Sequence, residues 1–465
     1  MVHETPPAHA TSVTRRGLLK TVGSAVSSAV LGTAACAPVV PPLPLVRTRL
    51  HRAPRVAADA GASLVPTSAP AFAPNALGYG GRVPGPVLEA RTGGEVHVVL
   101  DNRLSEPTTL HSHGAVVAHE MDGHPIDAVP PGASRAYRYP VLQRAGLLWV
   151  HPHPHGRVAA QVYHGLAGCL VVRDEDEDQL GLPSGDRELF LALRDATFDA
   201  EGRLRYAGSV SRIIGSGFRG RTPVVNGTPH ASCEVETALY RLRLLNASNA
   251  RVFRLSLSSG APLTIIGNDG GTLPAPVRVP SAVFGPAERL DVLLDLRTAR
   301  PGDRVALRCE EEGWDLLVFE VARAVEDVTE VPTDLPAIPS LPDVRRVDRT
   351  FRFQGNHTIN ERFYQMGEVR ARVPFGRTER WRFEGQLGGF HSVHVHGTQF
   401  QIVRREGQRS AVLPFERGWK DTVLLLSGEA VEVLVRFDRY RGLYLLHCHK
   451  LEHEDSGMML DFLVE

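Results

Sequence analysis

The chain has little of what marks a membrane protein, a disulfide scaffold or a nucleic-acid-binding protein. Its 465 residues include five cysteines and five methionines, and 52 basic residues balance 52 acidic ones. Zero formal net charge gives no reason to expect a nucleic acid or an anionic membrane surface as partner. No apolar run is long enough to span a membrane stably. Long helical periodicities are few, and 44 Gly and 34 Pro predict a β-rich, turn-rich chain.

The five cysteines are too few and too scattered for a disulfide framework. Cys36 belongs to the N-terminal segment and Cys448 to a histidine-rich motif, which leaves Cys169, Cys233 and Cys309. In an oxidising compartment these three could form one disulfide and leave one thiol. Packed structural thiols are the favoured interpretation, although the sequence alone does not decide the pairing.

The N-terminus has the features of an export signal. Residues 14–20 read TRRGLLK, which is typical of a twin-arginine signal. A weakly apolar stretch and then small residues follow, so residues 1–37 are predicted to be a cleaved signal peptide. Cys36 offers lipid attachment as an alternative, but Thr33 stands where a lipobox usually carries Leu. We expect export to the periplasm, the cell envelope or the exterior.

The rest of the chain divides into three β-rich units. Residues 38–70, rich in Pro, Ala and Arg, are expected to form a mobile leader. Residues 326–343, rich in Pro, Asp and Thr, are expected to be an interdomain linker. The units between and after these segments are residues 71–178, 179–325 and 344–465.

Short apolar runs within these units predict individual strands. The expected strands include residues 95–100, 165–172, 188–193, 241–245 and 291–296. The acidic run at residues 174–178 is expected to be a solvated connector.

The segment 447–459, HCHKLEHEDSGMM, says most about function. Two His, one Cys and a weak Met form the ligand set of a blue-copper electron-transfer site. Three ligands of such a site are present here: Cys448, His453 and Met458. On a strand, His447 and His449 would share one face and Cys448 would point to the other. The two spare histidines therefore predict a second metal site, joined to the first by the backbone.

Half of the 20 histidines fall into four clusters. The clusters are His111-Ser112-His113-Gly114, His151-Pro152-His153, His391-Ser392-Val393-His394-Val395-His396 and the segment just described. An HxH pair on a strand projects both imidazoles to one side, so each pair can contribute to one shared site. Eight imidazoles buried together without metal would leave many polar groups to satisfy. The clusters therefore predict a metal site shared by the first and last thirds of the chain.

These clusters resemble the ligand signatures of the multicopper oxidase family, in the order HxHG, HxH, HxxHxH and HCHxxxHxxxxM. Other segments resemble the family as well: Val225–Gly227, Arg243–Asn249 (RLLNASN), Phe284–Asp291 (FGPAERLD) and Gly418–Val423 (GWKDTV). The resemblance extends from about residue 76 to the end. HGTQF at 396–400 and HEDSGMM at 453–459 place it nearest the three-domain bacterial laccase, cuprous oxidase and bilirubin oxidase group.

The resemblance implies an all-β fold of three consecutive cupredoxin-like Greek-key β-sandwich or barrel domains, and four copper ions. The implied type 1 ligands are His391, Cys448, His453 and axial Met458, and the type 2 ligands are His111 and His394. The two type 3 ions would be held by His113, His151 and His449, and by His153, His396 and His447. We interpret His119, His124, His155 and His164 as non-ligands and Met459 as a core residue.

The resemblance also implies an activity. A laccase-like oxidase would couple one-electron oxidation of phenolic, aromatic or metal-ion donors to four-electron reduction of dioxygen to water. Cys448 would pass electrons to the flanking histidines. Asp122 and Glu454 match positions that the family uses for proton delivery, and Asp455 is a weaker choice. An axial Met implies a lower potential than Leu or Phe there. The chain is expected to be a monomer.

Two alternatives stay open. The first is a metallo-oxidase that acts on Cu(I), Fe(II) or Mn(II) in metal tolerance, but a specialised Cu(I) oxidase would be expected to carry a Met-rich insert, and this chain has five Met in all. The second is a non-catalytic cell-division scaffold of the same fold, whose members have lost copper ligands; every ligand is intact here. A nitrite reductase is disfavoured because the paired histidines form a trinuclear site instead.

Overall fold

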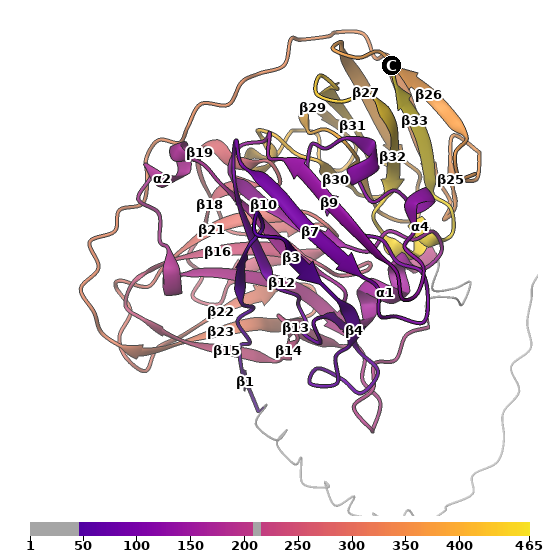
Figure 1. Cartoon of the computed structure of the whole chain (residues 1–465). Coiled ribbons are helices and arrows are strands. Elements are labelled where there is room, and N and C mark those ends of the chain that lie inside the picture. Colours follow the sequence, from indigo (N-terminus) through magenta and orange to yellow (C-terminus); the bar gives the residue numbers. More distant parts are fainter. Residues whose placement is uncertain (1–45, 208–214) are drawn as a thin grey trace, which may run out of the picture. The chain divides into compact units, whose positions relative to one another are not determined.

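The fold is described from a computed structural model, in which residues 46–207 and 215–465 are described. This part of the chain consists mainly of β-strands, which Figure 1 draws as arrows. Its helices are short: η1 (His119–Met121), η2 (Pro125–Asp127), α1 (Val158–His164), α2 (Glu175–Asp178), η3 (Gly185–Arg187), η4 (Pro414–Glu416) and α4 (Leu451–Asp455). None of the helices in these ranges is long and apolar enough to cross a membrane. The predicted signal peptide, residues 1–37, lies outside the described residues.

The first of three sandwiches packs a five-stranded sheet against a three-stranded one. The larger sheet has the order β2 (Arg55–Ala57), β6 (Val87–Arg91), β11 (Gly168–Arg173), β10 (Gly146–His151) and β8 (His111–His113). The smaller has β3 (Ala62–Leu64), β7 (Glu95–Asp101) and β9 (Ser134–Pro140), and β4 (Pro66–Ser68) pairs with β5 (Leu77–Tyr79). Every second residue of β7 is buried, and Val98 and Leu100 share a core with Leu148 and Leu170 of the larger sheet.

The second sandwich contains the two largest sheets. One has the order β1 (Thr48–Arg49), β15 (Ala231–Glu236), β23 (Trp314–Arg323), β22 (Arg304–Cys309), β17 (Phe253–Leu257) and β20 (Ala282–Phe284). The other has β14 (Thr228–Pro229), β13 (Thr222–Val225), β12 (Glu188–Ala196), β16 (Leu239–Asn246), β21 (Arg289–Asp295), β18 (Leu263–Asn268) and β19 (Gly271–Val279). Leu242 and Val292 of one sheet and Leu255 and Phe319 of the other share one apolar core.

The third sandwich consists of two five-stranded sheets. The first is β25 (Thr358–Ile359), β24 (Arg349–Gln354), β27 (Thr378–Gly385), β31 (Ala430–Arg436) and β29 (Phe400–Glu406). The second is β26 (Val369–Val373), β33 (Met459–Val464), β32 (Gly442–Cys448), β28 (His391–Val395) and β30 (Thr422–Leu425). Trp381 and Phe383 pack in a core that also contains Cys448 and Met458. The predicted all-β fold of three successive sandwiches is confirmed.

Two local predictions are wrong, the second only in part. Within the expected mobile leader, residues 48–68 form strands β1 to β4, because β1 and β2 add to sheet edges in parallel register with β15 and β6. The acidic run is solvated at Glu175, Asp176 and Asp178, as expected, but it is not an irregular connector and its Glu177 is not solvated. It forms α2, capped by Asp174, and Glu177 is buried because it pairs with Arg241 and Arg243 of the second sandwich.

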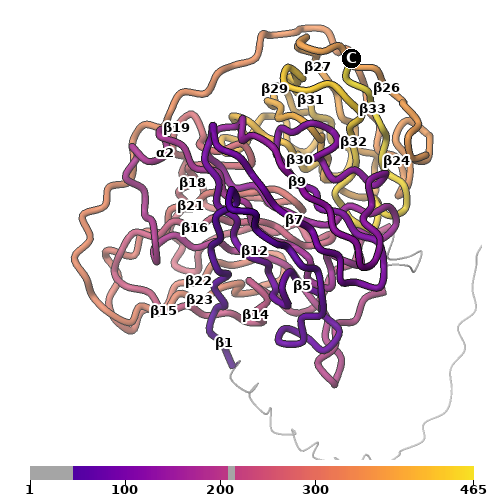
Figure 2. The backbone as a smooth tube through the Cα atoms, in the orientation of Figure 1, coloured from indigo at the N-terminus to yellow at the C-terminus, as the bar shows by residue number. Residues whose placement is uncertain are grey.

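The region of the expected linker contains no helix or strand between β23 and β24, within the described chain. Figure 2 shows it as an extended orange tube between the second and third sandwiches. Cys169, Cys233 and Cys309 are buried free thiols, which is the packed alternative that the sequence favoured.

Candidate metal centre

Strand register brings the predicted histidine pairs together. The antiparallel pairing of β8 with β10 sets His111 opposite His151. The pairing of β28 with β32 sets His394 opposite His447. All ten histidines of the four clusters are buried, with side chains at most 3% exposed. The first and third sandwiches therefore contribute one pair of strands each to a shared histidine cluster.

A mononuclear group lies at the C-terminal end of β32. The Sγ atom of Cys448 is 3.5 Å from Nδ1 of His391 and 3.8 Å from Nδ1 of His453. Ligands that bind one first-row metal ion at about 2.0–2.3 Å lie within roughly 4 Å of one another. Met458 is fully buried in the same core, and its carbonyl accepts a hydrogen bond from the amide of Cys448 at 3.1 Å. The three nearest donors thus fit one metal ion.

Two further groups form where the first and third sandwiches meet. Nε2 of His447 is 3.3 Å from Nε2 of His153 and 3.0 Å from Nε2 of His396. Nε2 of His111 is 3.4 Å from Nε2 of His394. These groupings coincide with one implied type 3 set and with the implied type 2 pair.

The remaining set uses a different ring nitrogen. Nδ1 of His113 lies 3.4 Å from Nε2 of His151, which is 3.5 Å from Nε2 of His449. Nε2 of His113 faces away, 3.0 Å from Oδ1 of Asp421 and 2.9 Å from the hydroxyl of Thr422. His113 therefore presents Nδ1 to the cluster, whereas its neighbours present Nε2.

The protonation of these histidines suits a metal. Burial is the main cause that lowers the pKa of the imidazoles: to about 3 for His153, His391 and His447, and well below the ordinary value for His113, His151, His394, His396, His449 and His453. The neutral imidazole is the form that binds a metal. Nitrogen donors at the cluster and two nitrogens with one sulfur at the mononuclear group are the ligands that copper takes. The residues therefore fit copper at both places.

Asp122 and Glu454 both contact the histidine cluster. Oδ2 of Asp122 is 2.7 Å from Nδ1 of His396, and its carbonyl is 2.6 Å from Nδ1 of His111. Burial raises the pKa of the Asp122 carboxyl, but the nearby His111 lowers it. The pKa is lowered overall. Oε2 of Glu454 is 3.2 Å from Nδ1 of His447. Burial raises the pKa of the Glu454 carboxyl to about 7.

Asp455, the weaker choice for a proton relay, contacts the first turn of α1. Its two carboxylate oxygens accept hydrogen bonds from the amides of Val158 and Ala159 at 2.9 Å each. These amides open α1 and have no partner within the helix. Asp455 of the third sandwich therefore caps a helix of the first.

The histidines interpreted as non-ligands lie outside these groups. Nε2 of His124 is 3.0 Å from Oδ1 of Asp461, and Nδ1 of His164 is 2.7 Å from the carbonyl of Ala160. His155 packs against the ring of Tyr364. Met459 is buried with Tyr364 and Leu445, apart from Met458.

Sequence reasoning missed three residues around the site. Asp421 and Arg289 lie behind His113, although both were part of segments that resemble the family. Lys450 is 1% exposed, and its ammonium lies 4.2 Å from the ring centroid of Phe390. Burial lowers the pKa of Lys450 to about 8. Its position directly after the HCH triplet was the available signal, but a lysine there reads as a surface residue.

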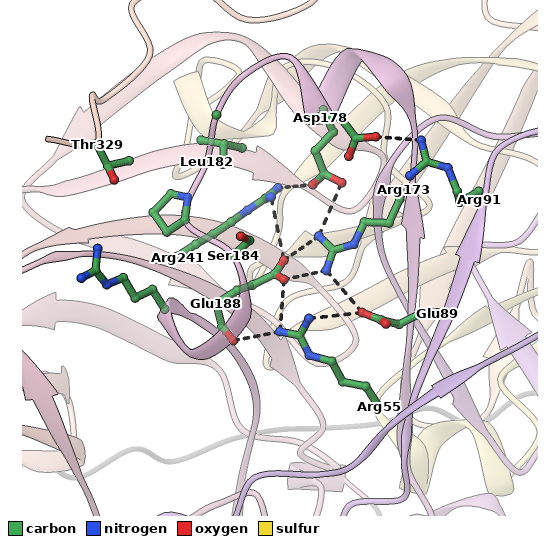
Figure 3. A pocket seen from close by; sticks show the side chains of 14 residues that line it. Arg55, Glu89, Arg91, Arg173, Asp178, Leu182, Ser184, Glu188, Arg241 and Thr329 are labelled. Atoms are coloured by element: carbon green, nitrogen blue, oxygen red, sulfur yellow. Dashed lines mark hydrogen bonds and ion pairs between the residues drawn. The ribbon is translucent and has the colours of Figure 1, made fainter. Parts of the chain in front are cut away.

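A separate polar cleft of about 680 Å³ has no histidine or cysteine among its lining residues. Figure 3 shows arginines and carboxylates along its wall. Arg173 pairs with Glu188 at 2.6 Å and Arg91 with Asp178 at 2.7 Å. The arginines of the cleft already have carboxylate partners. We therefore interpret these ion pairs as structural contacts between the first and second sandwiches and not as a ligand site.

The geometry defines a class of protein: a β-sandwich metalloprotein that joins a Cys-His mononuclear site to a polyhistidine cluster. Models of the multicopper oxidase family match residues 67–177 and 336–465. The multicopper oxidase mco of Staphylococcus aureus is 32% identical over 83% of each chain, and the laccase of Bacillus subtilis is 31% identical over 82% of this chain and 88% of its own. The crystal structure of McoA multicopper oxidase from Aquifex aeolicus superposes with a TM-score of 0.83 at 30% identity, covering 90% of this chain and all of that one.

The chain belongs to the multicopper oxidase family. It is a copper-dependent oxidoreductase that uses dioxygen as electron acceptor, and its three sandwiches are cupredoxin-like. The cell division protein FtsP of Escherichia coli is also 31% identical, over 83% of this chain and 85% of its own.

Proposed function

We propose that the protein is a laccase-like oxidase that holds four copper ions and oxidises phenolic or aromatic donors. One observation supports this most: Cys448 faces His391 and His453 while its neighbours His447 and His449 face the polyhistidine cluster. A protein that serves only as a scaffold does not need residues 447–449 to alternate between two groups of metal ligands. The twelve ligands are those given above for the type 1, type 2 and type 3 ions.

When bound, copper supplies one-electron oxidation of the donor and four-electron reduction of dioxygen. The chain supplies the rest. The backbone of residues 447–449 is a covalent connection between the two sites. Glu454 can hold and deliver a proton at its buried carboxyl, and Asp122 is an ionised carboxylate that accepts from Nδ1 of His396 and can pass protons on, since each contacts a histidine of the cluster. Burial of the ten cluster histidines keeps bulk water from the ligands.

The surroundings of the mononuclear group favour an aromatic donor over a metal cation. The ring beside His391 that is partly exposed is Phe390, which has the ammonium of Lys450 4.2 Å from its centroid. Phe353, 5.7 Å from the ring of His391, is a buried core residue behind it. A cation donor needs a group of carboxylate, imidazole or sulfur ligands. Among described residues, the groupings of possible metal ligands are confined to the histidine groups and to His113, His394 and Asp421. A metallo-oxidase would need a further group of metal ligands next to the mononuclear site, where the donor gives up its electron.

The proposal predicts a blue protein with about four copper ions per chain, because one Cys-His site and three polyhistidine sets are present. Copper content and visible absorption test the metal sites. Oxygen uptake tests the activity, with a panel of donors that contains phenols, aromatic amines, Fe(II), Mn(II) and Cu(I). We expect phenols and aromatic amines to give the highest kcat/KM. Faster uptake with a metal ion would favour the metallo-oxidase, and a copper-loaded protein without oxygen uptake would favour a scaffold.

We also propose that residues 1–37 direct twin-arginine export, with residues 71–178, 179–325 and 344–465 as the domains of the mature protein. Support comes from the Arg15-Arg16 pair in a segment ahead of β1. Arg15→Lys with Arg16→Lys is expected to leave the protein in the cytoplasmic fraction, as measured by immunoblotting of cell fractions. Unchanged export of this double variant would contradict the route.

A further inference from the structure

Arg289 of β21 contacts all three sandwiches at once. Its Nε donates to the carbonyl of Leu147, on β10 of the first sandwich, at 3.0 Å. Its Nη1 donates to the carbonyl of Ala287 at 2.7 Å and to Oδ1 of Asp421 in the third sandwich at 2.8 Å. Nη2 pairs with Oδ2 of the same carboxylate. Both side chains are fully buried, so this is a bidentate ion pair shielded from water.

Asp421 connects this pair to the histidine cluster. Its Oδ1 faces Nε2 of His113 at 3.0 Å, and its carbonyl faces Nδ1 of His394 at 2.8 Å. A carboxylate behind a metal-binding histidine fixes the tautomer and the orientation of the ring. Here it holds the proton of His113 on Nε2 and leaves Nδ1 free toward the cluster.

The glycine of the HxHG motif makes room for the ion pair. A Cβ atom on Gly114 would lie 2.4 Å from Oδ2 of Asp421 and 2.9 Å from Nη2 of Arg289. Gly114 also has φ +87°, a conformation that side chains rarely adopt. The motif thus supplies both a ligand and the space for the group that orients it.

We propose that Arg289, in the sandwich that contributes no ligand, is a positioning residue of the histidine cluster. It fixes the Asp421 carboxylate, which fixes His113 with Nδ1 toward the cluster. This inference rests on the proposed function, because it assigns a part in copper binding. The second sandwich then sets the geometry of the cluster as well as connecting its neighbours.

The test compares Arg289→Gln with Arg241→Gln. Arg241 is a matched control, because it is also a buried arginine of the second sandwich with carboxylate partners, Asp291 and Glu177, but lines the cleft of Figure 3 away from the histidines. We expect Arg289→Gln to lower copper affinity at the cluster by roughly 10- to 100-fold, with loss of the near-ultraviolet absorption of the coupled copper pair. The blue absorption of the Cys448 site should persist. Arg289→Lys, which keeps the charge, should restore part of the affinity.

Gly114→Ala tests the same inference with Arg289 and Asp421 left in place. Gly132→Ala is its control, because Gly132 has a similar φ of +76° but open space around the added Cβ. Only Gly114→Ala should reproduce the selective loss at the cluster. We expect Arg241→Gln to keep both the blue and the cluster copper. If Arg289→Gln keeps the copper content and spectra of wild type, or if it loses blue and cluster copper together, the inference is wrong. A wild type with no cluster copper would instead overturn the proposed function, and this inference with it.

Discussion

Cys448→Ser is expected to remove both the blue colour and the oxidase activity of the copper-loaded protein. The colour of such a site comes from charge transfer between the cysteine thiolate and copper, and a serine hydroxyl cannot replace that bond. Burial raises the pKa of the Cys448 thiol to about 11, so the thiolate forms only with a metal or cation beside it. The backbone of residues 447–449 stays intact in this variant, but it no longer carries a sulfur ligand that would attach the mononuclear site to it.

Cys169→Ser is the matched control for this experiment. Cys169 is an equally buried thiol, whose pKa burial raises to about 12, but it packs in an apolar group with Val87 and Trp149 and contacts no metal ligand. We expect this variant to lose some thermal stability and to keep its colour and turnover. Absorption spectra and oxygen uptake with one phenol distinguish the two. Blue colour in Cys448→Ser would disprove the assignment of the mononuclear site.

The four histidine clusters could be found in the sequence because each one is a local pattern. Alternation along a strand is enough to place His447 and His449 on one face and Cys448 on the other. The grouping of His153 with His396 and His447 came from the family resemblance, and the distances in the structure agree with it. The alternation depends on residue type and spacing alone, whereas the grouping joins residues of two sandwiches that are 294 positions apart in the chain.

The residues behind the ligands could not be predicted in the same way. The Arg289–Asp421 pair joins residues 132 apart in the chain, and nothing in the local sequence of either one indicates the other. Glu177 is a similar case, since an acidic run reads as solvated until Arg241 and Arg243 are known to lie beside it. Ion pairs between domains depend on how the sandwiches pack, which the pattern along one strand does not encode.

Glu454→Gln is expected to slow turnover by roughly 100-fold or more, because a positioned proton donor contributes about 10²- to 10⁴-fold. The Glu454 carboxyl is fully buried beside His447 and His153, and neither oxygen has a hydrogen-bond partner. With a pKa near 7, raised by burial, it can hold or release a proton at neutral pH. Glutamine keeps the shape of the side chain but cannot transfer the proton. Steady-state oxygen uptake measures the loss.

The step that slows should be oxygen reduction and not oxidation of the donor. Anaerobic bleaching of the blue absorption by a phenol should therefore keep its rate in Glu454→Gln, while re-oxidation by dioxygen becomes slow. Asp455→Asn is the control, since it weakens the cap on α1 by about 1 kcal/mol and should lower the melting temperature with little change in turnover. A Glu454→Gln variant that re-oxidises as fast as wild type would assign Glu454 to orienting His447 alone. Proton delivery would then rest on Asp122, whose carboxylate contacts His396 on the same side of the cluster as His111.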